Sequence, residues 1–243
     1  MQDAKSRGSR GLISIKKVDR KPTRVDRIGL WLSTSREIDG LWVGTTESKP
    51  HPALRRVEEA LQLIKRHDML SYSRVTRDLD RIWVNLIPSG QAHYDRSLNA
   101  CVIDERYVLP ETMSIAKLAS TIVHEATHAR LDGWGVAYVE EKRARIEEIC
   151  LQRELKFLAR LPDSKPLQEE VVSTTDWVAK DRDYLSDASF RERKEEGEIE
   201  TLRYLKTPDW LVRFFVWLAR RRRLRYARRL GNASIQPSPR DFH

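Results

Sequence analysis

The chain has 243 residues, of which 40% are hydrophobic and seven are tryptophan, which is ample for one sizeable core. Charged residues make up 33% of the chain and the net charge is +9, so we expect an acidic partner such as a membrane surface, a nucleic acid or an acidic protein. The two cysteines have no CxxC spacing, the N-terminus lacks an apolar signal region and no run of ~20 apolar residues occurs, which argues against a disulfide framework, secretion and a transmembrane helix.

The first part of the chain is predicted to pass from a basic tail to a hairpin. Residues 1–26 are basic and poor in large apolar groups, so we expect them to be flexible. Residues 27–35 and 41–46 have the composition of short strands. Asp39 and Gly40 between them are typical of a tight hairpin turn.

A helix and two further strands are predicted next. Prolines open a helix over 52–67, which has apolar residues at helical spacing on one face. Residues 81–87 and 100–109 are rich in β-branched and aromatic residues and are predicted as strands. The segment between these two strands is predicted as a loop.

An HExxH motif lies in the sequence TIVHEATHAR, within a helix predicted over 112–131. His124 and His128 are four residues apart, so on a helix they lie on one face and can bind one metal ion. Glu125 points roughly a quarter-turn away, where it can contact a water on the metal rather than the metal itself. Zinc lowers the pKa of such a water, and a carboxylate can then take its proton. The motif therefore predicts a Zn²⁺ site with His124 and His128 as ligands and Glu125 as the catalytic base.

Four more helices are predicted after the motif. They cover 138–161, 166–180, 186–205 and 207–230. The third is predicted to be a marginal, solvated helix, because it is dense in charge and contains Gly197. The fourth has a clear start, since Thr207, Pro208 and Asp209 provide a cap, a first-turn proline and an acid for the helix dipole.

The last predicted helix combines an apolar half with an arginine-rich half. The segment from Trp210 to Arg229 has the two features that weak peripheral binding to an acidic membrane requires. A buried core helix with a solvated arginine tail explains the same pattern and stays open as the alternative. Residues 231–243 are expected to be disordered.

The motif and the helix after it resemble the zincin metallopeptidases, in particular the gluzincins. The resemblance is specific over about ten residues around the motif and looser over 81–161, where the order and spacing of elements also fit. It implies that the two histidines bind zinc, that Glu125 is the general base, and that strand 100–109 or its neighbour holds the substrate. One position departs from the family pattern, which prefers an apolar residue two after the second histidine, where this chain has Arg130.

The resemblance also implies a third zinc ligand, a glutamate on the next helix. On a helical wheel Glu147 lies about 40° from the centre of the apolar face, whereas Glu148 points towards solvent. Cys150 supplies the small residue that the family has three positions after this ligand. Glu148 stays open, because some family members place the ligand one residue further along. Glu154 also faces inward and can accept a hydrogen bond from a zinc-binding histidine.

These elements predict an α+β fold, mostly helical, with a small sheet packed beside the HExxH helix. We expect residues 27–206 to form one zincin-like metallopeptidase domain, flanked by the flexible N-terminus, the C-terminal helix and the tail. The chain has no GxSxG, P-loop or GxGxxG motif, so serine-hydrolase and nucleotide-binding functions have no support. The predicted function is zinc-dependent hydrolysis of a peptide or protein in the cytoplasm, with peripheral membrane contact as an option.

A catalytically inactive adaptor is the competing hypothesis. It would be a basic zinc-binding protein that docks on an acidic membrane or a nucleic acid, although we do not favour nucleic acid. Against it, a structural zinc site is usually closed by four protein ligands, mostly cysteine, whereas HExxH leaves one position open. The residue that stabilises the oxyanion also stays open, and the candidates are Tyr138, Tyr184, His93 and Tyr94.

Overall fold

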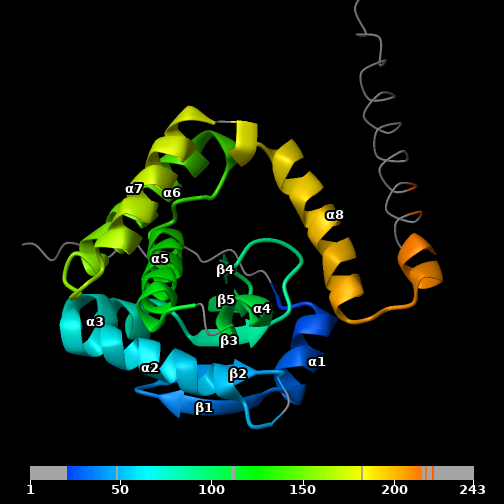
Figure 1. The fold of residues 1–243 in the computed structure, drawn as a ribbon, viewed down its shortest axis with the longest axis horizontal. Coiled ribbons are helices and arrows are strands. Elements are labelled where there is room, and N and C mark those ends of the chain that lie inside the picture. The colour runs from blue at the N-terminus through cyan, green and yellow to red at the C-terminus, as the bar shows by residue number, and fades with distance from the viewer. Residues whose placement is uncertain are drawn as a thin grey trace, which may run out of the picture.

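The computed structural model describes residues 21–47, 49–110, 113–181 and 183–214, together with 217 and 221 (Figure 1). The strands are β1 (Thr34–Ile38), β2 (Leu41–Thr45), β3 (Arg81–Asn85), β4 (Ala92–Asp95) and β5 (Ala100–Asp104). The helices are α1 (Arg24–Leu32), α2 (Pro52–His67), α3 (Met69–Asp78), α4 (Glu105–Val108), α5 (Ile115–Gly133), α6 (Glu140–Leu158), α7 (Lys165–Lys180), the short 3₁₀ helix η1 (Asp183–Leu185) and α8 (Asp187–Tyr204). The expected α+β fold, mostly helical with a small sheet, is confirmed.

The five strands of the described residues form one mixed sheet in the order β1-β2-β3-β5-β4. β2, β3 and β5 run parallel to one another, whereas β1 and β4 are antiparallel edge strands. The register places Val43 opposite Ile82 and Ile82 opposite Cys101, so these side chains form a row across the sheet. The HExxH helix α5 packs against β4 and β5, as the sequence predicted for this helix and a small sheet.

Side chains alternate between the two faces of the sheet, as the two-residue period of a strand requires. Val43, Ile82 and Cys101 point into the main core, which they share with buried residues of α2, α3 and α5. Trp83 and Val102 point to the other face, in a smaller cluster to which α1 contributes a half-buried leucine. The sheet therefore separates the side that carries α5 from the side that carries α1.

The prediction of a strand over 27–35 is wrong, because most of these residues belong to α1. Thr23 and Asp26 form a capping box, in which Asp26 N donates to Thr23 Oγ1 at 3.1 Å and Thr23 N donates to Asp26 Oδ2 at 2.8 Å. Gly29 then lies against the ring of Trp83, where a Cβ atom would come within 2.8 Å. This cap and this close contact outweigh the strand-like composition. The helix also begins inside the stretch 1–26 that we expected to be flexible, and residues 1–20 lie outside the described residues.

The hairpin turn is confirmed, although its first strand lies later than predicted. β1 pairs with β2 across Asp39 and Gly40, which have φ angles of 48° and 82°. Positive φ at both central residues is what a two-residue hairpin turn of type I′ requires. The turn chemistry therefore located the hairpin more reliably than the composition of its first strand.

The predicted strand 100–109 is too long, and its last residues form α4 instead. Asp104 ends β5 and caps this short helix by accepting a hydrogen bond from Arg106 N at 2.7 Å. Neither α3 nor β4 was predicted from the sequence. α3 starts at a second aspartate cap, Asp68, which accepts a hydrogen bond from Ser71 N at 3.1 Å. β4 is only four residues long and exists because it pairs with β5.

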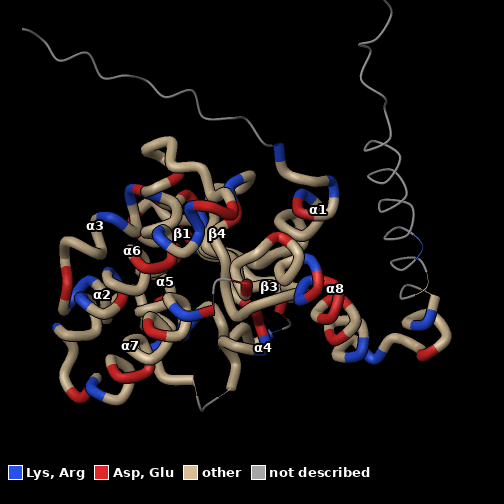
Figure 2. Tube along the Cα trace, turned by 90° about the horizontal axis from the view of Figure 1, so that it is seen from above, with Lys and Arg blue, Asp and Glu red and all other residues tan. Residues whose placement is uncertain are grey.

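Helices α5 to α8 lie close to their predicted limits, but α8 is held by the residue that was expected to weaken it. Gly197 is buried, and a Cβ atom at this position would lie 1.2 Å from the carbonyl oxygen of Pro88. Only glycine allows α8 to approach the loop after β3 this closely. The rest of α8 carries acidic and basic residues along its length, as a solvated helix does (Figure 2).

The C-terminal segment is only partly described. Residues 209–214 are helical, and the exposed fractions of Trp210 and Trp217 are 71% and 51%. Most of the arginine-rich part of 207–230 and all of 231–243 lie outside the described residues. Within the part of the chain that is described, no helix is both long enough and apolar enough to cross a membrane.

Candidate metal centre

The two histidines of the motif lie side by side in the middle of α5. Ser114 caps this helix, because its side chain accepts a hydrogen bond from Lys117 N at 3.1 Å. The buried apolar residues of α5 pack towards the core. This leaves His124 and His128 together on another side of the helix, with their Nε2 atoms 3.3 Å apart. Two ring nitrogens at this distance share a proton or a cation, since their lone pairs would otherwise repel.

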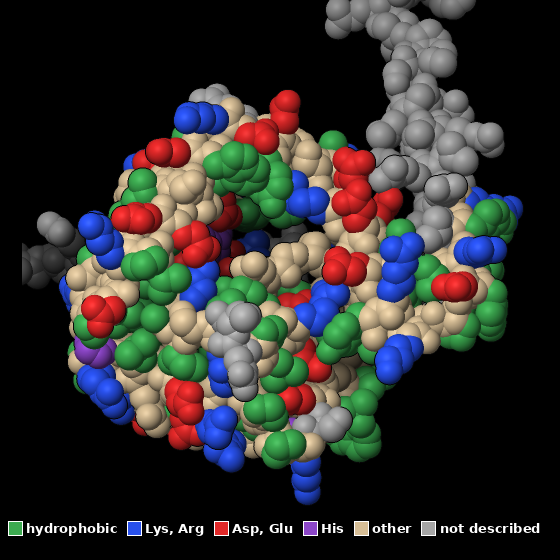
Figure 3. Space-filling view, in the orientation of Figure 1, with side chains coloured by type: hydrophobic (Ala, Val, Ile, Leu, Met, Phe, Trp, Pro, Cys, Tyr) green, Lys and Arg blue, Asp and Glu red, His purple; other side chains and the backbone are tan. Residues whose placement is uncertain are grey.

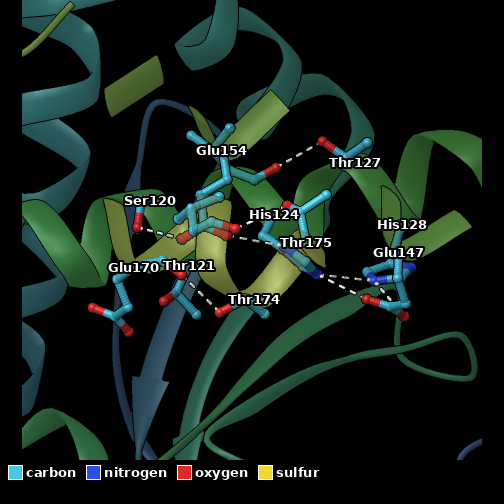
Figure 4. A network of polar contacts seen from close by, with 12 residues as sticks. Ser120, Thr121, His124, Thr127, His128, Glu147, Glu154, Glu170, Thr174 and Thr175 are labelled. Carbon is cyan, nitrogen blue, oxygen red and sulfur yellow. Dashed lines mark hydrogen bonds and ion pairs between the residues drawn. The ribbon is translucent and has the colours of Figure 1, made fainter. Parts of the chain in front are cut away.

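Glu147 reaches the histidines from α6, the helix that packs most extensively on α5. Its Oε2 atom lies 3.3 Å from His124 Nε2, and its Oε1 atom lies 3.5 Å from His128 Nε2. The carboxylate therefore faces both imidazole rings at once (Figure 4). Glu148, the alternative from the sequence, instead bonds Arg145 and Gln152 on the outer side of α6.

A second carboxylate holds the opposite edge of the His124 ring. Glu154 Oε2 lies 3.2 Å from His124 Nδ1, and Ser120 Oγ donates to Glu154 Oε1 at 2.8 Å. Lys117 Nζ lies 3.7 Å from the same carboxylate and 3.0 Å from Glu170. Figure 4 shows Ser120 and Glu154 on one side of His124, and Glu147 with His128 on the other.

Glu125 is buried next to this cluster, with an exposed fraction of 6%. It makes no hydrogen bond or ion pair with any residue that the structure describes. Burial, followed by the charge of Glu125, raises the pKa of the Cys101 thiol on β5. Burying a carboxylate without a protein partner costs free energy unless a water molecule or a cation binds to it.

The charges of the cluster are strongly coupled. Burial alone would lower the pKa of His124, but its contacts with Glu147 and Glu154 raise that pKa well above the ordinary value. Burial alone would raise the pKa of Glu147, but hydrogen bonds from His124 and His128 lower it far below the ordinary value. The pKa of Glu154 is lowered for the same reason, since His124 outweighs burial. Both carboxylates are therefore ionised and prepared to bind positive charge.

The structure brings one of the four oxyanion candidates to the cluster. Tyr138 donates its hydroxyl to Glu147 Oε1 at 2.5 Å, and its ring meets that of His128 edge to face. Tyr94 instead lies in hydrogen-bonding contact with Asn99 and Asp132. Tyr184 meets the ring of Trp177 edge to face, and His93 is exposed on β4. Tyr138 is thus the candidate whose hydroxyl is next to a predicted ligand.

Cys150, which the sequence indicated only as a small residue after Glu147, lies close to the two histidines. Its Sγ atom and one ring nitrogen each of His124 and His128 all lie within 4.8 Å of one another. The thiol is buried and packs with Leu131 and Ile146. Burial, together with the charge of Glu147, raises its pKa well above the ordinary value. This protonated, apolar setting favours Glu147 over Cys150 as the third ligand.

The donor atoms of His124, His128 and Glu147 lie close to the spacing of a tetrahedral zinc site. In a tetrahedral site with bonds of about 2.0–2.1 Å, any two ligand atoms lie roughly 3.3–3.4 Å apart. The observed separations are 3.3 Å between the two histidine Nε2 atoms, 3.3 Å from His124 Nε2 to Glu147 Oε2 and 3.5 Å from His128 Nε2 to Glu147 Oε1, so a different carboxylate oxygen faces each ring. Two imidazoles and one carboxylate also leave a fourth position for water or substrate. The residues present therefore fit a catalytic zinc ion.

The side chains that support the cluster were largely missed from the sequence. Ser120 precedes His124 by one helical turn, so spacing alone could have placed it on the same face. Lys117 precedes His124 by two helical turns on α5, so spacing also places it near this face, whereas Glu170 comes from α7 and carried no local signal. Figure 3, in the orientation of Figure 1, shows a hollow in which acidic and histidine side chains are visible.

The chain matches no protein-family model, no curated protein and no solved structure. A functional conclusion for this chain therefore rests on the geometry and chemistry of the cluster.

Proposed function

We propose that the protein is a zinc-dependent peptidase in which His124, His128 and Glu147 hold the metal. One observation carries the proposal. The Nε2 atoms of the two histidines lie 3.3 Å apart, one oxygen of Glu147 lies 3.3 Å from His124 and the other lies 3.5 Å from His128, and Glu125 is buried on the same helix. This is the arrangement that the resemblance to gluzincins implies, and no described residue closes the fourth position with a thiolate.

Glu125 would act as the base and then as the acid of the reaction. A bound zinc ion would polarise both a water molecule and the carbonyl of the scissile bond. Glu125 makes no ion pair or hydrogen bond within the described part of the chain, so its carboxylate is available to take the proton of that water. The same carboxyl group would then return a proton to the leaving amine.

The remaining side chains would orient the ligands and the substrate. Glu154 accepts a hydrogen bond from His124 Nδ1–H, which leaves the Nε2 lone pair free to bind a metal. Tyr138 lies next to Glu147, and its hydroxyl can move to the developing oxyanion as the substrate binds. Each of these roles uses a donor or acceptor that the structure already holds at the cluster.

An extended peptide at the edge of the sheet is the proposed substrate. β4 is an edge strand, antiparallel to β5 and packed against α5, so a peptide can add to its free edge through backbone hydrogen bonds. The strand over 100–109 was expected to be the edge strand or its neighbour. β5 is an inner strand with β4 beside it, which supports the second of these two positions.

Replacing the proposed base tests the function. We expect the purified protein with zinc to cleave a mixed library of fluorogenic peptides, and Glu125→Gln to lower the rate about 10²–10⁴-fold while zinc stays bound. The amide has nearly the same shape as the carboxylate but cannot accept the proton. Glu105→Gln, a change of the same kind on α4, serves as the control and should cleave normally.

Two results would contradict the proposal. Cleavage by Glu125→Gln at the normal rate would remove Glu125 from the mechanism. No cleavage of any peptide by the zinc-loaded protein would instead favour the inactive adaptor, whose zinc has a structural role. Zinc content is measured in the same samples, so loss of activity through loss of metal is recognised.

Localisation and membrane contact are part of the same proposal. Cys101 and Cys150 are free buried thiols, which supports a reducing compartment such as the cytoplasm. The exposed rings of Trp210 and Trp217 support contact of the C-terminal segment with an acidic membrane surface. Co-sedimentation with anionic vesicles, with and without residues 209–243, would test this contact, and equal binding by both proteins would refute it.

A further inference from the structure

A small pocket lies on the other side of the HExxH helix, where three arginines from three helices meet. Arg74 of α3, Arg130 of α5 and Arg153 of α6 line this pocket, whose volume is about 20 Å³. The hydroxyl-bearing residues Ser71 and Thr127 complete its polar lining. Arg130 is also the residue that departs from the zincin pattern, which has an apolar side chain at this position.

The guanidinium groups of this pocket have few partners among the described residues, and the two carboxylates near them are shared with other arginines. Arg74 and Arg153 make no hydrogen bond or ion pair with any described residue, and the Nε atom of Arg74 is buried without a partner. Arg130 Nη1 is also buried without a hydrogen bond, although it forms a long ion pair of 3.9 Å with Asp78 and its guanidinium lies over the ring of Trp134. The same Asp78 oxygen already accepts a hydrogen bond from Arg77 at 2.9 Å.

Asp68, a second acidic residue near the pocket, also has other partners. Asp68 lies close enough to Arg74 to attract it, but its carboxylate accepts hydrogen bonds from Ser71 and forms an ion pair with Arg160. Burial, together with the positive charges of Arg153 and Arg130, lowers the pKa of Arg74. Like charges around one small pocket repel one another unless an anion lies between them.

We propose that Arg74, Arg130 and Arg153 form a binding site for a phosphate group. Guanidinium groups offer paired N–H donors that match the oxygens of a phosphate, and three positive charges suit a dianion. The pocket has room for one or two oxygen atoms and opens to solvent. The rest of the phosphate would lie at the mouth, where Arg153 is exposed.

A bound phosphate would connect the helices that carry the candidate zinc ligands. α5 provides Arg130 together with His124 and His128, and α6 provides Arg153 together with Glu147. The anion would bridge these helices to α3 from the side opposite Glu147. The site does not depend on the proposed peptidase activity, because none of its residues contacts the metal cluster.

Thermal unfolding with inorganic phosphate tests the site. Ionic strength is kept constant with chloride, and the metal content of the protein is left as purified. We expect phosphate to raise the melting temperature by roughly 2 to 5 °C at about ten times its dissociation constant. Arg74→Gln and Arg153→Gln should each weaken phosphate binding about tenfold or more. Arg145→Gln, which removes an exposed arginine of α6 that pairs with Glu148, should bind phosphate normally.

The same variants separate binding at the arginine pocket from binding at a metal ion, where phosphate could also attach. Without phosphate, Arg74→Gln should be about as stable as the unchanged protein, because the substitution relieves repulsion from Arg130 and Arg153 and breaks no hydrogen bond or close ion pair of the described residues. His124→Ala, which removes a candidate metal ligand, should keep the phosphate-induced shift. A shift that is lost in His124→Ala but kept in Arg74→Gln overturns the proposal, as does a shift no larger than that with chloride.

Parallel titration with glycerol phosphate identifies the source of the phosphate group. Weaker binding of the ester than of inorganic phosphate supports a site for the free anion. Equal or stronger binding of the ester supports a site for a phosphorylated small molecule. Failure of both to bind overturns the proposal.

Discussion

The Nδ1 atom of His124 lies 3.2 Å from Oε2 of Glu154, so the imidazole ring is held at the edge opposite Glu147. With a metal ion bound in place of the second proton, this contact would keep the remaining proton on Nδ1. The lone pair of Nε2 would then face His128 and Glu147. Partners of this kind orient a metal-binding histidine and raise its basicity.

Glu154→Gln should therefore weaken zinc binding without abolishing it. The amide oxygen can still accept a hydrogen bond, but the charge that raises the basicity of His124 is lost. We expect zinc affinity to fall about 10–100-fold, measured by competition with a chromophoric chelator. Glu170→Gln is the matched control, since Glu170 reaches the cluster only through Lys117. Equal affinity of both variants and the unchanged protein would show that Glu154 does not support the site.

Tyr138→Phe should separate metal binding from catalysis. The substitution keeps the ring that packs against His128 and removes the hydroxyl that donates to Glu147. We expect zinc to stay bound and kcat on a cleaved peptide to fall about 10²-fold or more, because one oxyanion donor is lost. Tyr184→Phe, in a ring that meets Trp177 edge to face, should leave kcat unchanged. Equal rates for both variants would exclude Tyr138 from the chemistry.

Cys150→Ala distinguishes the two possible third ligands. Cys150 is close enough to the histidines to be considered, but its thiol is buried in an apolar cluster and its pKa is raised by burial and then by Glu147. If Glu147 is the ligand, Cys150→Ala should keep its zinc in metal analysis. The loss of one buried sulfur should lower the melting temperature by only a few degrees. Loss of zinc from this folded variant would identify Cys150 as the ligand instead.

Gly197→Ala tests how α8 is held against the rest of the domain. In a solvated helix this change would stabilise the protein by about 1 kcal/mol, because alanine has the higher helix propensity. Here the added Cβ atom would lie 1.2 Å from Pro88 O, so α8 must shift. We expect the free energy of unfolding to fall by about 1–3 kcal/mol in a urea titration. Glu198→Ala, at the exposed neighbouring position, should change it by less than about 0.5 kcal/mol, and stabilisation by Gly197→Ala would contradict the observed packing.

The sequence predicted the parts of the site that one helix determines. His124 and His128 share a face because they are four residues apart, and the apolar stripe of α6 indicated that Glu147 faces inward. The structure shows Glu147 beside both histidines and Glu154 beside His124. Their binding of zinc stays a prediction.

The features that the sequence did not predict depend on contacts between distant residues. β4 is a strand only because it pairs with β5, and Gly29 is helical where its neighbours have strand composition because α1 packs on Trp83. Local propensity is a weak guide when such packing decides the outcome. The arginine pocket is of the same kind, since its three arginines come from three separate helices.

Zinc content is the most direct test of the proposed centre, and Glu147→Ala and Glu148→Ala form the decisive pair. Both variants remove a glutamate from α6, but only Glu147 faces the histidines, while Glu148 pairs with Arg145. Atomic absorption on the purified proteins should find about one zinc per chain in the unchanged protein and in Glu148→Ala, and almost none in Glu147→Ala. Full zinc content in Glu147→Ala, or no zinc in the unchanged protein, would contradict the assignment of this cluster as a zinc centre.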